Sequence, residues 1–157
     1  MTTDTPTTDH GPRLDVLGLT GPVTAAMARV EGRLELDPVL RELIKLRASQ
    51  INGCAFCLDM HWTDAKAAGE SDARLAQLAA HAESPFFDLR ERAVLALTDA
   101  VTRLEAGGVP DAVWAEAERH LDGTELAHVL WQIAAINAWN RIAVSARFVP
   151  AGWDPAA

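Results

Sequence analysis

Cys54 and Cys57 are the two cysteines of the chain, and two residues separate them in the segment Cys-Ala-Phe-Cys. His61 follows four residues after the second cysteine, and Glu42 lies twelve residues before the first. A two-residue gap lets one sulfur reach the other with almost no backbone movement, so the pair can repeatedly form and break a disulfide during a reaction. These residue types and their spacing predict redox chemistry.

A helix that begins at or just before Cys54 would place Cys54, Cys57 and His61 on one face, because positions three, four and seven apart lie together on a helix. The partial positive charge at a helix N-terminus would also favour the thiolate. Glu42 belongs to the preceding helix. It can approach His61 only if the two helices pack side by side.

Acidifying a thiol explains little of a catalytic rate by itself. Lowering its pKa from about 8.5 to about 6.5 raises the thiolate fraction at neutral pH roughly 25-fold. The less basic thiolate is about 8-fold less nucleophilic, so the net gain is only ~3-fold. Turnover also needs a positioned proton donor, and we expect His61 and Glu42 to act as the general acid and base.

Two other interpretations of the cysteine pair are open at this stage. A structural disulfide would close so small a ring that it would contribute only ~2 kcal/mol, and a reducing compartment would open it. Zinc could be bound by Cys54, Cys57 and His61 with Glu42 as a fourth ligand, although structural zinc sites usually draw on two spaced pairs of ligands and the sequence has one. A non-catalytic redox sensor or a metal-binding interaction module is therefore the alternative to an enzyme.

Composition and charge argue against a membrane-spanning protein and against a nucleic-acid-binding protein. The 157 residues suit one domain with a hydrophobic core of its own, and the 49% of apolar residues contain no run of ~20 that would span a membrane. The net charge of −8 and the scattered basic residues oppose nucleic-acid binding. No glycine-rich phosphate loop or dinucleotide fingerprint is present, so we expect no cofactor. We also expect no bound metal, because the sequence has no second CxxC or histidine pair. The polar N-terminal segment lacks the features of a secretory signal, which predicts a cytoplasmic protein.

Apolar residues recur at spacings of three and four, and strand-like alternation is nearly absent. We therefore predict an all-α bundle of about seven helices in a single domain over 21–150, with a flexible arm over 1–20 and an irregular tail over 151–157. Proline, glycine, aspartate and serine mark the breaks between helices. The predicted helices cover residues 22–34, 38–50, 54–68, 72–82, 86–106, 110–121 and 124–147.

Two polar residues of the last predicted helix, Asn137 and Asn140, lie among apolar neighbours. Burial would oblige them to find hydrogen-bond partners, so we expect a polar contact across helices or subunits. On the same helix His128 and Gln132 lie one turn apart and could border a cavity.

The segment from Glu42 to His61 resembles the signature of the alkylhydroperoxidase D-like family, also called the carboxymuconolactone decarboxylase-like superfamily. Residues 67–70, 92–98 and 136–142 are also similar to family segments, so the resemblance covers most of residues 22–150. It implies an all-α fold and a homo-oligomer, commonly a trimer or a hexamer.

The resemblance also implies a role for each site residue. Cys57 would be the thiol that attacks a hydroperoxide or a disulfide, Cys54 its disulfide partner, His61 the residue that takes its proton, and Glu42 the relay behind His61. An external dithiol would reopen the disulfide. The decarboxylase branch works without the cysteine pair, so the pair argues against that activity. The best-known peroxidases of the family have a histidine before the second cysteine, where this chain has Phe56, which favours slower peroxide or disulfide reduction.

Overall fold

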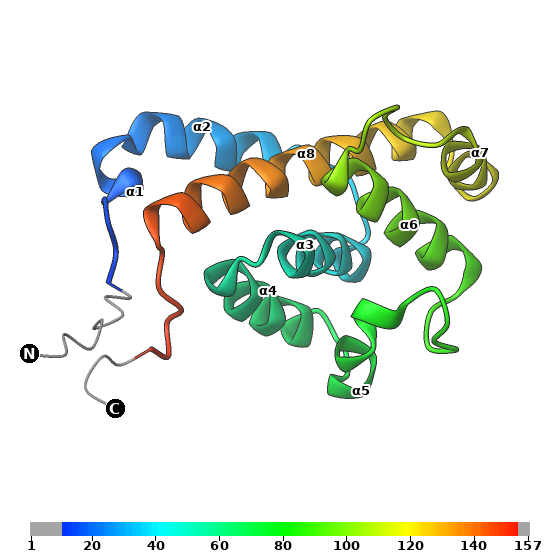
Figure 1. Ribbon diagram of the computed structural model, residues 1–157, viewed down its shortest axis with the longest axis horizontal. Coiled ribbons are helices and arrows are strands. Elements are labelled where there is room, and N and C mark those ends of the chain that lie inside the picture. The colour runs from blue at the N-terminus through cyan, green and yellow to red at the C-terminus, as the bar shows by residue number, and fades with distance from the viewer. Residues whose placement is uncertain (1–10, 154–157) are drawn as a thin grey trace, which may run out of the picture.

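The computed structural model describes residues 11–153, and within them it is all-helical, with eight α-helices, one 3₁₀ helix and no strand (Figure 1). The expected all-α fold is confirmed. None of these helices is long and apolar enough to cross a membrane. The elements are α1 (Val16–Leu19), α2 (Gly21–Glu31), α3 (Pro38–Asn52), α4 (Ala55–Ala67), α5 (Asp72–Ala76), η1 (Leu78–Ala80), α6 (Leu89–Arg103), α7 (Asp111–His120) and α8 (Gly123–Ala146).

Helix α3 lies at the centre of the fold and packs against α4, α6 and α8 (Figure 1). Its start is set by Asp37, whose carboxylate accepts the backbone N–H of Leu40 at 3.0 Å, and by Pro38 in the first turn. Its end is set by Gly53, which has φ of 65° and donates its N–H to the carbonyl of Ser49. Glycine adopts this left-handed conformation without strain, so the chain turns sharply from α3 into α4.

Three clusters of buried apolar side chains form the core. The first joins α3 and α6 to α7 and α8, and the second joins α3 to α4, α5, η1 and α6. The third is small and contains both cysteines together with Ala48, Ile136 and Ala143. The thiols therefore lie where α3, α4 and α8 meet.

Three predicted helices have bounds that differ by three or more residues in the structure. The helix predicted over 22–34 ends at Glu31, because the chain turns at Gly32. The segment predicted as one helix over 72–82 is α5 followed by η1, because the chain leaves the α conformation at Gln77 (φ −97°, ψ 1°). The helix predicted over 86–106 begins at Leu89, because Asp88 and Glu91 form a capping box. It ends at Arg103, since Leu104 adopts a left-handed conformation.

The segment expected as part of an irregular arm contains a short helix. Asp15 caps α1 by accepting the N–H of Gly18 at 2.9 Å, and Arg13 donates its backbone N–H to the carbonyl of Ala146 at the end of α8. The rest of the predicted arm, residues 1–10, and the last four residues of the predicted tail lie outside the described residues. Neither α1 nor α2 contains a buried residue, so both lie on the surface of the bundle.

A candidate dithiol active site

Cys54 and Cys57 occupy the N-terminus of α4. Cys54 is the N-cap residue, and its sulfur accepts the backbone N–H of Cys57 at 3.4 Å. Both side chains are free thiols, and only 1% of Cys54 and 2% of Cys57 is exposed. The expected start of the helix at or just before Cys54 agrees with this geometry. The cap places one sulfur against the positive end of the helix.

The two thiols have unequal acidity. A hydrogen bond from the Cys57 thiol, supported by the Cys57 N–H and by Asn140 and opposed by burial, lowers the pKa of Cys54 from 9.0 to about 7. The pKa of Cys57 is raised above its ordinary value by the hydrogen bond to Cys54, by burial and by the negative charge on Cys54. When the pair loses one proton, the negative charge therefore lies on Cys54, while Cys57 keeps its proton.

Asn140 and Ser49 complete the surroundings of the sulfurs. The Asn140 amide acts to lower the pKa of both thiols, and the Ser49 hydroxyl acts to lower the pKa of Cys57. Asn140 also donates to the Ser49 hydroxyl at 3.0 Å and accepts from Asn52 at 2.9 Å, and neither Asn140 nor Ser49 is exposed. The expected polar contact of Asn137 and Asn140 across helices is confirmed, since Asn52 of α3 donates to both. Their sequence context gave no sign that Asn140 contacts the thiols.

His61 and Glu42 form a buried pair between α4 and α3. Nδ1 of His61 lies 2.8 Å from Oε2 of Glu42, and the two helices pack side by side as expected. Burial of the Glu42 carboxyl acts to raise its pKa, but the hydrogen bond to His61 and the Lys45 ammonium 3.2 Å away hold that pKa below 4.5. An ionised carboxylate only accepts hydrogen bonds, so it fixes the proton on Nδ1 and leaves Nε2 of His61 able to accept a proton.

A polar network extends from this pair to α2 and α8. Lys45 lies 4.0 Å from Glu31, the last residue of α2. The Glu31 carboxylate accepts hydrogen bonds from the indole of Trp139 at 2.7 Å and from the amide of Gln132 at 3.2 Å. Gln132 therefore contacts α2, whereas His128 accepts the backbone N–H of Glu35 at 2.7 Å. The sequence pattern predicted none of the contacts of Glu31.

The side chains that the structure brings together as possible metal ligands are not the zinc ligands considered from the sequence, which were Cys54, Cys57, His61 and Glu42. Within the described part of the chain, potential ligand atoms of Glu42, His61 and Asp64 lie within 4.8 Å of one another, and neither cysteine belongs to that group. The Lys45 ammonium bonds the same Glu42 carboxylate, which opposes a cation there. These three side chains are the ones that could hold a metal.

The sequence pattern of the carboxymuconolactone decarboxylase family matches residues 21–100, which include Glu42, both cysteines and His61. The chain belongs to this family. It is 37% identical to the uncharacterized protein YdfG of Bacillus subtilis over 76% of its own length and 81% of that protein. It is also 35% identical to the uncharacterized protein YnjA of Escherichia coli over 74% of its own length, but it covers only 60% of YnjA.

Solved structures extend the comparison to the fold. A structure from Agrobacterium tumefaciens, described as a protein of unknown function and a candidate antioxidant defence protein AhpD, superimposes with a TM-score of 0.85 at 35% identity, over 89% of this chain and 98% of that one. The debrominase Bmp8 superimposes with a TM-score of 0.77 over 87% of this chain and 75% of that chain. At 16% identity, Bmp8 shows a shared fold alone. The chain thus has the AhpD-like helical fold, in a family with a general redox-related role.

Proposed function

We propose that the protein is a thiol-dependent oxidoreductase that reduces hydroperoxides or disulfides by cycling Cys54 and Cys57 between dithiol and disulfide. An external dithiol would return the pair to the reduced state. The observation that carries the proposal is the arrangement at the start of α4. The Cys54 sulfur accepts the N–H of Cys57, and the bonded pair of His61 and Glu42 follows one turn later.

In the peroxide reaction, Nε2 of His61 takes the proton of the Cys57 thiol, and the Cys57 sulfur attacks one oxygen of the hydroperoxide. The O–O bond breaks, the leaving oxygen takes the proton back from Nε2 of His61 to become an alcohol, and Cys57 becomes a sulfenic acid. The Cys54 thiolate then attacks the Cys57 sulfur, the S–O bond breaks, and the departing hydroxide takes a proton from solvent and leaves as water. The disulfide that remains holds the two oxidising equivalents.

The unequal acidity of the thiols suits these two steps. Because the pKa of Cys57 is raised, its sulfur needs a base, and His61 is the group that Glu42 holds ready for that role. Because the pKa of Cys54 is about 7, roughly half of Cys54 is ionised at neutral pH, and this thiolate can attack the sulfenic acid without a further base.

Phe56 supports a moderate rather than a fast peroxidase. It occupies the position before Cys57 and packs edge to face on Phe148, with ring centroids 5.4 Å apart, so it supplies packing and no proton transfer. The relative described as a candidate antioxidant defence protein supports the same class of chemistry. We further propose that the protein acts in the cytoplasm as a homo-oligomer.

The test is steady-state consumption of cumene hydroperoxide with dithiothreitol as the reductant. We expect Cys57→Ser to abolish turnover, and His61→Gln to lower kcat/KM for the peroxide by about 100-fold, the scale of a lost general base. Cys54→Ser should still consume one equivalent of peroxide and stop at a sulfenic acid. Normal turnover by Cys57→Ser would disprove the proposal.

Metal analysis of protein purified without reductant separates the proposal from its rival. A 54–57 disulfide with no metal fits either the catalytic cycle or a non-catalytic redox sensor, and steady-state consumption of the hydroperoxide then separates the enzyme from the sensor. Stoichiometric zinc together with no peroxide or disulfide turnover would instead support the metal-binding interaction module.

A further inference from the structure

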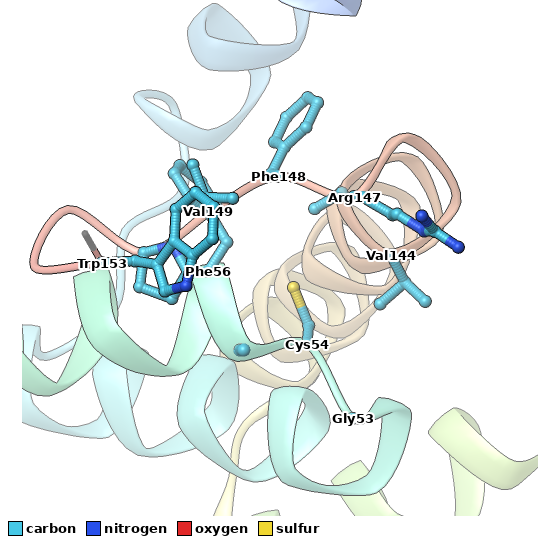
Figure 2. A pocket seen from close by; sticks show the side chains of 11 residues that line it. Gly53, Cys54, Phe56, Val144, Arg147, Phe148, Val149 and Trp153 are labelled. Carbon is cyan, nitrogen blue, oxygen red and sulfur yellow. The ribbon is translucent and has the colours of Figure 1, made fainter. Parts of the chain in front are cut away.

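A second cluster of charged side chains lies away from the dithiol, beside a cavity of about 440 Å³. The cavity is bordered by α6, by the segment around η1 and by the loop before α7, on the side of the bundle away from α1 (Figure 1). No described residue lines both this cavity and the one around the Cys54 sulfur that Figure 2 shows, or both this cavity and the one beside Cys57. Its volume is in the range of small-molecule sites. The cavity is therefore separate from the proposed redox site.

His81 is a buried residue of this cavity with an unpaired polar atom. Only 5% of the residue is exposed, and it lines the cavity at the end of η1. Its Nε2 lies 3.6 Å from Oδ2 of Asp99, and a carboxylate at this distance favours a ring proton on Nε2. Nδ1 is buried and has no hydrogen-bond partner among the described residues. Leaving such an atom unpaired costs free energy, so a bonding partner inside the cavity would be stabilising.

Arg103 has a side of its guanidinium available for a carboxylate. Arg47 pairs with Asp99 through Nε and Nη2, the two nitrogens that bind a carboxylate side by side. Arg103 contacts the same Asp99 through Nη1 at 3.0 Å, and no described residue accepts a hydrogen bond from its Nε or Nη2. The side chain of Arg103 is 44% exposed and lines the cavity. It can therefore bind a further carboxylate in the way that Arg47 binds Asp99.

Most of the remaining lining is apolar. It is formed by small side chains and one ring: Ala79, Ala82, Ala96, Ala100, Pro110 and Val113. A short hydrocarbon chain can lie against them without burying a polar group. Glu105 also lines the cavity and is exposed, and with Asp99 it disfavours a ligand of more than one negative charge.

We propose that this cavity binds a small hydroxycarboxylate, an aliphatic monocarboxylate with one hydroxyl group. The hydroxyl bonds Nδ1 of His81. A hydroxyl suits that atom in either protonation state, because it donates to a bare ring nitrogen and accepts from an N–H. The carboxylate pairs with Nε and Nη2 of Arg103, and the hydrocarbon part lies on the apolar lining. No covalent bond is made or broken, and the inference does not depend on the proposed redox cycle.

The test is an NMR titration of the full chain with 3-hydroxybutanoate and 4-hydroxybutanoate, which differ in the spacing between hydroxyl and carboxylate. Affinity is measured by ligand-detected saturation transfer, and the contact by the ¹⁵N resonance of Nδ1 in histidine-labelled protein. We expect at least one probe to bind saturably with a Kd of about 1 mM, a scale suited to so small a ligand. The Nδ1 resonance of His81 should shift, and the resonances of His61 should not.

Three further probes each lack one required feature. Butanoate has no hydroxyl, and we expect it to bind about three- to tenfold more weakly, the scale of one neutral hydrogen bond. Butane-1,4-diol has no carboxylate, and we expect about tenfold or more, the scale of a hydrogen bond to a charged group. Inorganic phosphate, with its second negative charge, should bind more weakly than the hydroxybutanoates.

Two pairs of variants assign the binding to the cavity. His81→Phe keeps a ring but removes Nδ1, so it should bind the hydroxybutanoates no more tightly than butanoate. His120→Phe changes a histidine of α7 outside the cavity and should leave the affinity unchanged. Arg103→Gln should lower the affinity about tenfold or more. Arg119→Gln changes an exposed arginine outside the cavity and should not lower it.

Several results would overturn the inference. If neither hydroxybutanoate binds saturably, water is a sufficient partner for Nδ1 of His81. Equal affinity for butanoate and the hydroxybutanoates, tighter binding of phosphate, or unchanged affinity in His81→Phe would each exclude a hydroxycarboxylate site. None of these measurements uses a peroxide or the cysteines, so their outcome is independent of the peroxidase assay.

Discussion

Asn140 connects the two sulfurs to the rest of the protein. Its amide hydrogen-bonds Ser49 and Asn52, and it acts to lower the pKa of both thiols. A buried amide that contributes a donor to a thiolate favours the charged form, because no water is present to replace it. Asn140 is therefore a positioning residue for the dithiol.

Asn140→Leu tests this role. Thiolate absorbance at 240 nm should titrate with a midpoint of about 7 in the unmodified protein, and in the variant the midpoint should move upward toward 9.0. The sign follows because loss of a donor disfavours the thiolate, so a higher pH is needed to form it. Asn137→Leu is the matched control, because Asn137 also accepts from Asn52. Equal shifts in the two variants would assign the effect to the lost contact with Asn52.

Site residues could be predicted from the sequence where their side-chain type and their spacing along one helix indicated their role. The two cysteines and His61 share one helix, and their positions follow from helical periodicity. Glu42 could be included because the family signature contains it. Asn140 could not, because it lies over 80 residues away from the cysteines in sequence, and only the packing of α8 against α3 and α4 brings it to the sulfurs.

At the scale of the elements, α2 is held to the bundle mainly by polar contacts. It contains no buried residue, and its last residue, Glu31, bonds Trp139 and Gln132 of α8. With Leu17 and Thr24, Glu31 also lines a cavity of about 320 Å³ that reaches Cys57 and His61. The Glu31 carboxylate thus contributes to the position of α2 and of one wall of this cavity.

Glu31→Ala should loosen α2 without unfolding the bundle. Hydrogen exchange of the amides in 21–31 should accelerate by about tenfold or more, because hydrogen bonds to a charged group contribute about 1.5 to 3 kcal/mol. The melting temperature should fall by much less than the local exchange suggests, since no apolar side chain of α2 is buried. Glu35→Ala, an exposed glutamate four residues later, is the control. Unchanged exchange in Glu31→Ala would contradict this account.

Helix existence was predictable from periodicity, whereas helix bounds depended on local chemistry and packing. Ser84-Pro85 has the composition of a helix start, yet the Ser84 hydroxyl donates to Gln77 and accepts the N–H of Phe86, which closes a loop. The start three residues later uses the capping box of Asp88 and Glu91. Both segments have residues that can start a helix. The choice between them depends on which side chains form hydrogen bonds elsewhere in the tertiary structure, and the sequence does not give these bonds.

At the scale of the whole molecule, α3 contributes side chains both to the dithiol site and to the contact with α6. Glu42, Lys45 and Ser49 are spaced by three and four positions and serve the site between α4 and α8. Arg47 projects instead toward α6, where its guanidinium forms two hydrogen bonds with Asp99 at 2.5 and 2.7 Å. Helix α3 therefore carries both the Glu42–His61 contact to α4 and the Arg47–Asp99 contact to α6.

Asp99→Asn should reveal how much this link contributes to stability. Burial acts to raise the pKa of Asp99, but hydrogen bonds from His81, Arg47 and Arg103 hold it far below 3.8. The stabilisation is therefore fully present above pH 3.8 and is lost as pH falls from there toward the depressed pKa. At pH 7 the variant should lose about 2 to 3 kcal/mol of unfolding free energy, since it leaves a buried arginine without its anion.

Urea unfolding at pH 7 and pH 3 measures the difference in unfolding free energy between the unmodified protein and Asp99→Asn. This difference should be smaller at pH 3. Asp111→Asn changes an exposed aspartate and should alter neither value; a loss that does not vary with pH would show that the Asp99 carboxylate contributes through packing, not charge.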